Sequence, residues 1–199
     1  MHTMSFALRR GLRAALAPLA VALVAVALAG CSDPFKLKAS YANEPFVFSL
    51  YALTGKGPLN APSAIDLTAR SVVRTDGTFA FDVALDLDSR GKILIYPQKL
   101  VGSSLSGART VGLQRVSGTY EALLLGPPTG YQTDSILAVN VGEPVAIRVT
   151  SSSCVYQLST DLYAKIVVDS LGSGGLMYGR GVFNPNCGFR SFADGIPDK

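Results

Sequence analysis

Residues 79–88, FAFDVALDLD, set the fold class of this chain, because apolar side chains there alternate with small or acidic ones. The five apolar residues at odd positions fall on one face of an extended chain, since successive side chains of a β-strand point to opposite sides. The other face carries three aspartates, Asp82, Asp86 and Asp88. The pattern predicts a half-buried β-strand whose acidic face lies in water.

Turn residues stand on both sides of this strand. Asp76-Gly77 is a strong hairpin signal, because glycine accepts the positive φ that a type I′ turn requires. Residues 88–91, DSRG, turn the chain again. We therefore expect residues 72–96 to form a three-stranded antiparallel meander that ends at Pro97.

Short strand patterns recur along the rest of the chain, separated by Gly and Pro turns. A hairpin around 142–144 and a closing hairpin around 172–175 are expected, and residues 62–70 are compatible with a short helix. This organisation favours an all-β antiparallel β-sandwich, with a small β-barrel as the alternative. The sandwich is expected to be immunoglobulin-like in architecture but not in kinship, because the chain has no Trp and so lacks the buried Trp of antibody-type domains. The further strands are expected at 46–53, 110–116, 120–125, 136–141, 145–150, 155–158, 163–171 and 176–183.

The first thirty residues have the composition of a secretion leader. Three arginines between residues 9 and 13 precede an uncharged apolar run, residues 14–29, which is the arrangement of a secretory signal peptide. The run ends on Leu28-Ala29-Gly30-Cys31, which resembles the lipobox of bacterial lipoproteins. This resemblance is confined to the leader, and it implies that Cys31 takes lipid before residues 1–30 are removed.

The alternative is that the apolar run remains as a membrane-spanning helix, since about 17 to 25 apolar residues can cross a bilayer. Both interpretations place the body on the periplasmic face of a membrane, because the arginines resist translocation. Ser32 stands where an Asp tends to hold such lipoproteins at the inner membrane, so the resemblance mildly favours the outer membrane. Residues 31–43 are expected to be a lipidated tether and residues 44–199 a single β-sandwich domain.

The charge of the chain beyond the leader is close to neutral. Three of the 18 basic residues belong to the leader, and no acidic residue does, which leaves 15 basic against 14 acidic residues. No Lys/Arg cluster is present that could neutralise several phosphates on one face. We therefore expect no nucleic-acid partner.

Two cysteines remain once Cys31 is assigned to lipid, and they lie in a compartment where disulfides persist. We predict that Cys154 pairs with Cys187, which would stabilise the fold by roughly 3 to 4 kcal/mol. A redox-active or metal-bound pair is the weaker interpretation, because the two are far apart in sequence and no His is near to complete a site.

Catalytic equipment is sparse. The only histidine, His2, belongs to the leader, which removes Ser-His-Asp and Cys-His machinery and the His ligands of most catalytic metal sites. We assign no catalytic residue and no cofactor. A pair of carboxylates could still catalyse hydrolysis, although glutamates are few: Glu44, Glu121 and Glu143.

Four residues are candidates for contact with a ligand or partner. Tyr131 belongs to the Pro/Gly-rich loop 126–135, and Phe189, Arg190 and Phe192 belong to the C-terminal tail. Packing on the sandwich is the more frequent role for such residues. A weak calcium pattern at Asp86 and Asp88 lacks a third early ligand and the bidentate Glu.

These observations favour a non-catalytic lipoprotein that acts as an accessory or scaffolding subunit of a membrane or envelope complex, with a protein partner. A glycan or small-ligand binding module is the first alternative. A carboxylate-dependent hydrolase is the second.

Overall fold

The computed structural model describes residues 38–55, 57–76, 79–102, 109–155, 157 and 159–197, which belong to the compact unit Ala39–Lys199 except for Lys38. The leader and Cys31 lie outside the described residues, so cleavage and lipidation stay predictions. Among the described residues, no helix is long and apolar enough to cross a membrane.

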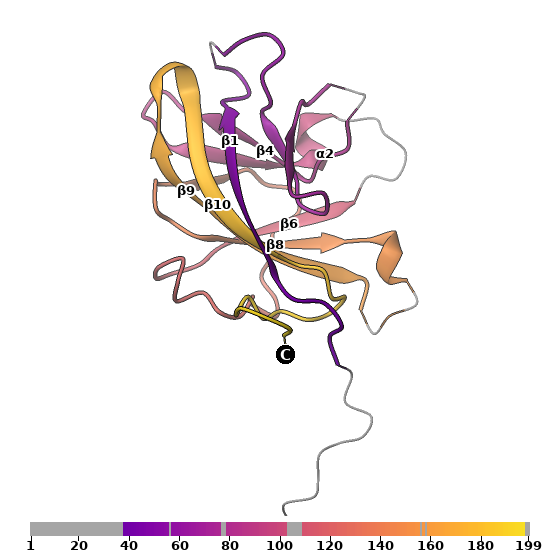
Figure 1. Ribbon diagram of the computed structural model, residues 1–199. Helices are drawn as coiled ribbons and strands as arrows, with labels where there is room; N and C mark the ends of the chain where they lie inside the picture. The colour runs from indigo at the N-terminus through magenta and orange to yellow at the C-terminus, as the bar shows by residue number, and fades with distance from the viewer. Residues whose placement is uncertain are drawn as a thin grey trace, which may run out of the picture. The chain divides into compact units, whose positions relative to one another are not determined.

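Two five-stranded antiparallel sheets face each other across one main core (Figure 1). A short helix, α2 (Gln98–Val101), and two 3₁₀ turns, η1 (Ser152–Cys154) and η2 (Ser173–Gly175), connect strands. The first sheet has the order β1 (Glu44–Tyr51), β10 (Leu176–Asn184), β9 (Asp161–Leu171), β8 (Val145–Thr150), β6 (Thr110–Arg115). The second has the order β3 (Ser71–Val73), β2 (Ala64–Asp66), β4 (Val83–Leu87), β5 (Ile93–Pro97), β7 (Leu137–Val139).

The predicted antiparallel β-sandwich is confirmed, and the two sheets are not closed into the barrel that was the alternative. An immunoglobulin domain places strands A, B, E and D in one sheet and C, F and G in the other. The strand order here is different, so the likeness to immunoglobulin domains lies in the two-sheet architecture.

Aromatic residues of β1 lie across glycines of β10. Phe46 pairs with Gly181 and Phe48 with Gly179 in the strand register. A Cβ added to Gly181 would lie 2.5 Å from the Phe46 ring, and one added to Gly179 would lie 2.3 Å from the Phe48 ring. The alternate glycines of β10 therefore make room for the alternate aromatic side chains of its neighbour.

The prediction that the acidic face of β4 lies in water is wrong, because both faces of this strand are buried. Asp82 is 0% exposed, and Asp86 is buried as well. A second layer of apolar side chains, with Phe81 and Ala84 at its centre, covers the side of the sheet that was expected to face water. Asp82 accepts a hydrogen bond from the Leu67 backbone N–H at 2.8 Å, and Asp86 accepts one from that of Thr54 at 3.1 Å.

Several predicted pairings are also wrong. β3 and β4 do not form the hairpin expected at Asp76-Gly77, because β2 lies between them. β7 and β8 are not a hairpin, because β7 pairs with β5 in one sheet and β8 with β6 and β9 in the other. Residues 62–70 contain β2 instead of a helix, and residues 120–125 form turns with one bridge, Leu125 to Ser191.

The closing hairpin and the disulfide are confirmed. β9 and β10 pair along their length, and Cys154 in η1 bonds to Cys187 beyond β10 with the two Cα atoms 5.7 Å apart. No strand spans 155–158: Val155 follows η1 in a turn, while residues 156 and 158 lie outside the described residues. The disulfide joins the two ends of the last hairpin.

Hydrogen bonds hold the segment that enters β1 against the C-terminal segment. The side-chain amide of Asn43 donates to the carbonyl oxygens of Ser191 and Ala193, at 2.9 and 2.6 Å. Asn186 Oδ1 accepts from the backbone N–H groups of Ser40 and Tyr41. The beginning of the described chain is therefore fixed to its end.

Candidate functional site

The outer face of the first sheet, which points away from the main core, carries a second apolar cluster. Its buried members include Leu123, Tyr163 and Phe192. Two segments of the chain, 116–131 and 189–193, cover this part of the sheet and bond to each other. The Phe192 N–H donates to the Leu124 carbonyl at 2.8 Å, and the Gly126 N–H donates to the Arg190 carbonyl at 2.7 Å.

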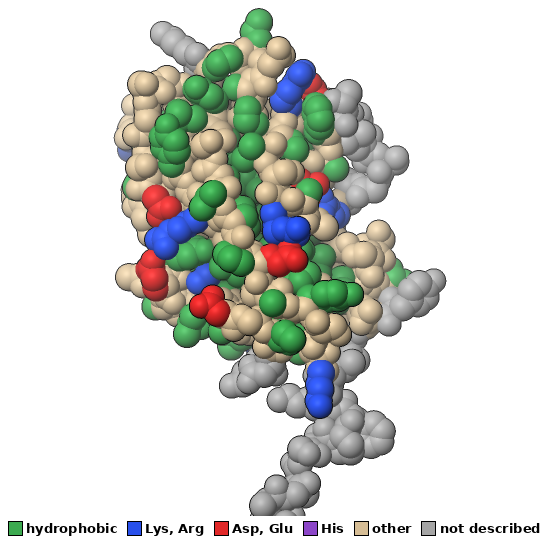
Figure 2. Space-filling view, in the orientation of Figure 1, with side chains coloured by type: hydrophobic (Ala, Val, Ile, Leu, Met, Phe, Trp, Pro, Cys, Tyr) green, Lys and Arg blue, Asp and Glu red, His purple; other side chains and the backbone are tan. Residues whose placement is uncertain are grey.

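A cavity of about 630 Å³, which we call the outer groove, lies beside this cluster. Its floor is made by side chains of β9 and β10, Lys165, Arg180 and Val182. Pro45 and Val47 of β1 line one side and Tyr120 and Leu124 the other, and Phe192 and Asp194 of the C-terminal segment also line it. Figure 2 shows hydrophobic side chains beside a row of alternating acidic and basic ones on this part of the surface.

Lys165 fixes the covering segment to the sheet. Its side chain is 3% exposed, and Nζ donates to the carbonyl oxygens of Tyr120 and Leu123, both at 2.9 Å. Nζ also lies 4.2 Å from the centre of the Tyr120 ring. Burial lowers the pKa of Lys165 below its ordinary value, and the negative charge of Glu121 opposes that change.

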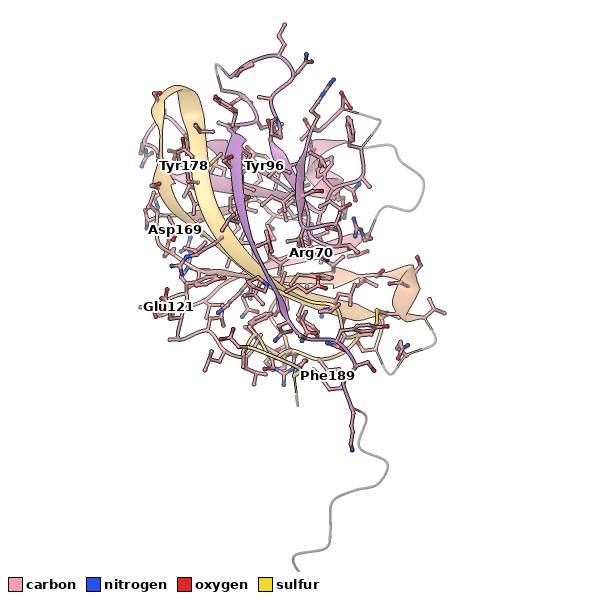
Figure 3. All side chains as sticks on the ribbon, viewed as in Figure 1. Arg70, Tyr96, Glu121, Asp169, Tyr178 and Phe189 are labelled. Carbon is pink, nitrogen blue, oxygen red and sulfur yellow. A yellow bond between two sulfur atoms is a disulfide. The ribbon has the colours of Figure 1, made fainter. Side chains whose placement is uncertain are left out.

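Arg180 covers the same tyrosine. Its guanidinium lies 4.5 Å from the centre of the Tyr120 ring and forms ion pairs with Glu121 at 2.9 Å and Asp169 at 3.2 Å. These two acids lie along one edge of the molecule (Figure 3). Tyr120 is 9% exposed, and burial raises its pKa to about 12. With a cation near the ring from both Lys165 and Arg180, Tyr120 is a poor stacking platform for a sugar.

Tyr131 is held against the sandwich. Its ring centre lies 6.1 Å from that of Tyr163, and the Arg148 guanidinium lies 5.2 Å from it. Gly112 of β6 leaves room for it, since a Cβ there would lie 2.7 Å from that of Tyr131. Burial raises the pKa of the Tyr131 hydroxyl. Tyr131 packs on the sheet and does not line the outer groove.

The three tail candidates have different places. Phe192 is buried and lines the outer groove. Arg190 donates from Nη1 to the Gly126 carbonyl at 2.7 Å, and the Phe189 carbonyl accepts from the Asn184 side chain at 3.0 Å. Arg190 thus joins the tail to the loop and Phe189 joins the tail to the end of β10, whereas Phe192 alone of the three lines the groove.

The weak calcium pair is not brought together. Asp86 is buried and accepts from the Thr54 hydroxyl, whereas Asp88 accepts from the backbone N–H groups of Arg90 and Lys92 in its own turn. Within the described residues there is no group of three His, Cys, Asp or Glu side chains that could hold a metal ion.

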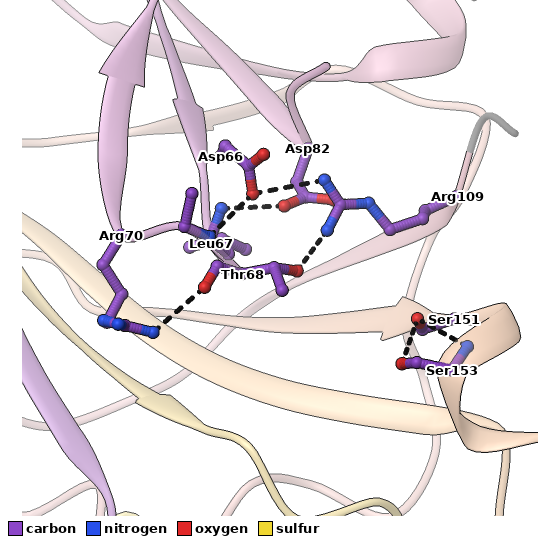
Figure 4. A network of polar contacts seen from close by, with 9 residues as sticks. Asp66, Leu67, Thr68, Arg70, Asp82, Arg109, Ser151 and Ser153 are labelled. Atoms are coloured by element: carbon purple, nitrogen blue, oxygen red, sulfur yellow. Dashed lines mark hydrogen bonds and ion pairs between the residues drawn. The ribbon is translucent and has the colours of Figure 1, made fainter.

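A second polar cluster joins the two sheets (Figure 4). Arg109, just before β6, forms ion pairs with Asp82 at 3.0 Å and Asp66 at 3.2 Å, and also bonds the Thr68 hydroxyl. Burial raises the pKa of Asp82 from 3.8 to about 6, although the charge of Arg109 opposes this. Because the charges of this cluster pair with one another, we interpret it as structural.

Sequence reasoning missed Lys165, Arg180 and Tyr120. The available signal was a single lysine inside the apolar run LYAKIVV, residues 162–168. Such a residue is buried only where acceptors replace water, and these come from the segment 120–123, which was expected to be a strand.

The structure is thus a disulfide-bonded β-sandwich with a groove beside the outer face of its first sheet. No family model matches the chain, and neither the curated proteins nor the solved structures contain a significant match.

Proposed function

We propose that this chain is a non-catalytic accessory or scaffolding subunit, held on the periplasmic face of a membrane by lipid on Cys31, and that a partner protein docks in the outer groove. The observation that carries the docking proposal is the apolar rim of the groove. Val47 is 82% exposed and Leu124 is 55% exposed, on opposite sides of one cavity. Exposed apolar side chains that gather into one patch mark sites that bind proteins, membranes or ligands, and we assign this one to a protein.

The non-catalytic part of the proposal is supported by the state of the two acids that line the groove, Glu121 and Asp194. Glu121 is paired with Arg180, and Asp194 is exposed. A glycosidase needs two carboxylates that flank a bond in one cleft. The glycan-binding alternative has less support because Tyr120 is covered by two cations.

The membrane attachment is supported by the leader and by the lipobox-like residues that end at Cys31. Metabolic labelling with a palmitate analogue should mark the wild-type chain and leave Cys31→Ala unlabelled. Labelling of Cys31→Ala to the wild-type level would contradict lipidation at this residue.

Photo-crosslinking in cells tests the docking. A photoreactive amino acid at position 47 should give a discrete crosslinked band, and Leu124→Ser in the same chain should weaken that band several-fold. The matched control carries the photoreactive residue at Val155, which is also exposed but does not line the groove. A band of equal strength from position 155, or one indifferent to Leu124→Ser, would contradict docking in the groove.

A further inference from the structure

We infer that the outer groove receives the C-terminal end of the partner polypeptide. Its terminal carboxylate meets the ammonium group of Lys165, and its last, apolar side chain lies between Val47 and Leu124. This inference rests on the proposed docking function and names the chemistry of the docked segment.

The Lys165 ammonium group has two carbonyl acceptors and the Tyr120 ring beside it but no carboxylate partner among the described residues. An ammonium group has three N–H donors, and two of these bond to the carbonyl oxygens of Tyr120 and Leu123. The described residues place no carboxylate within ion-pair distance of Nζ, although the side chain is almost fully buried and lines the cavity. A buried charge is costly without a counter-ion, so a carboxylate in the groove would supply what the fold leaves out.

The charges around the groove favour an anionic occupant. Arg180 is matched by Glu121 and Asp169, and Asp194 is an exposed residue at the rim. The electrostatic interactions of a charge in water are screened. Those of a buried charge act through a medium of low polarity and are several times stronger over short distances. Lys165 therefore outweighs Asp194 inside the groove, and an anionic group is favoured over a cationic one.

The open shape of the groove suits the end of a peptide better than a free fatty acid. A free fatty acid would need most of its surface enclosed, but the apolar sides of this groove open to solvent at Val47 and Leu124. The end of a peptide can leave its polar backbone in water while one side chain and the terminal carboxylate enter the cavity. Capture of a C-terminal carboxylate by backbone N–H groups is an established mode of peptide recognition, and in the proposed complex the Lys165 ammonium group takes the place of those donors.

The experiment compares two peptides that differ only at the terminus. The full chain is placed in lipid nanodiscs, and fluorescence polarisation follows a rhodamine-labelled Gly-Ser-Gly-Leu peptide with a free C-terminus or a C-terminal amide. We expect the free acid to bind at least tenfold more tightly. Lys165→Met should reduce that preference to near unity, Lys165→Arg should keep it, and Val47→Ser should weaken both peptides alike.

Equal affinities of the acid and the amide for the wild-type chain would overturn the inference, and this comparison needs no variant to fold. Displacement of both peptides by dodecanoate, with no preference between them, would overturn it as well, because the occupant would then be a lipid. Either result would leave the crosslink at position 47 unaffected, so failure of the carboxylate site is distinguishable from failure of the docking proposal.

Discussion

Asp82 has an environment that makes its ionisation unfavourable in the folded protein. Its carboxylate is fully buried at the start of β4, with Arg109 and the Leu67 N–H as partners. The change in pKa from 3.8 to about 6 corresponds to about 3 kcal/mol. Because the folded state binds this proton more tightly, the contribution to the free energy of unfolding is full below pH 3.8 and is lost as the pH rises through about 6.

Asp82→Asn tests this sign. The free energy of unfolding of the wild type, relative to that of Asp82→Asn, should fall by about 2 to 3 kcal/mol between pH 3.5 and 7. Urea unfolding of both proteins at several pH values measures it. Asp88→Asn is the control with the opposite slope, because backbone N–H groups lower the pKa of Asp88 and its contribution grows as pH rises. A pH-independent difference for Asp82→Asn would contradict the buried ionisation.

Lys165→Met should destabilise the fold and loosen the segment above it. The change leaves the carbonyl oxygens of Tyr120 and Leu123 without their donor, which costs about 2 to 4 kcal/mol. Urea unfolding measures the loss, and hydrogen exchange should accelerate most in residues 120–124. Lys92→Met, at a surface turn, is the matched control and should change stability by less than about 0.5 kcal/mol. Equal effects of the two substitutions would refute the role given to Lys165.

Among the secondary-structure elements, the close contact between β1 and β10 requires glycine, which has no side chain, at positions 179 and 181. Gly179→Ala should lower the free energy of unfolding by about 1 to 3 kcal/mol, because a Cβ there would lie 2.3 Å from the Phe48 ring and 2.4 Å from the Val167 carbonyl oxygen. Thermal unfolding of the wild type and of Gly179→Ala measures this loss of stability. Ser49→Ala on the exposed side of β1 is the control, and a comparable loss in both variants would rule out a steric cause.

Individual strands were predictable because their patterns are local, whereas strand partners depend on distant residues. The glycines at 172, 174 and 175 correctly indicated the β9–β10 hairpin. The similar turn signal at 142–144 marks a passage from one sheet to the other. The acidic residues of β4 were assigned to water because the sequence does not reveal that loops and α2 cover the second sheet. The outer groove could not be predicted, since its parts come from β1, β9, β10 and two covering segments.

For the whole molecule, the disulfide is a covalent link that restricts the conformational freedom of the unfolded chain. Cys154 and Cys187 are 33 residues apart, and closing a loop of that length should stabilise the fold by about 4 kcal/mol. The double variant Cys154→Ala with Cys187→Ala should lose that amount in urea unfolding. The oxidised and reduced wild type should differ by a similar amount. Unchanged stability of the double variant would contradict this account.

The bonds between Asn43 and the C-terminal segment affect how the domain responds to a pulling force. A pull on the N-terminal end would first load the bonds of Ser40 and Tyr41 to Asn186, and then the bonds of Asn43 to the carbonyl oxygens of Ser191 and Ala193, before it reached β1. Val47, on the rim of the outer groove, follows Asn43 by only a few residues. Tension would therefore strain the attachment of the tail before it separated the strands, so the proposed docking in the outer groove should respond to load before the sandwich unfolds.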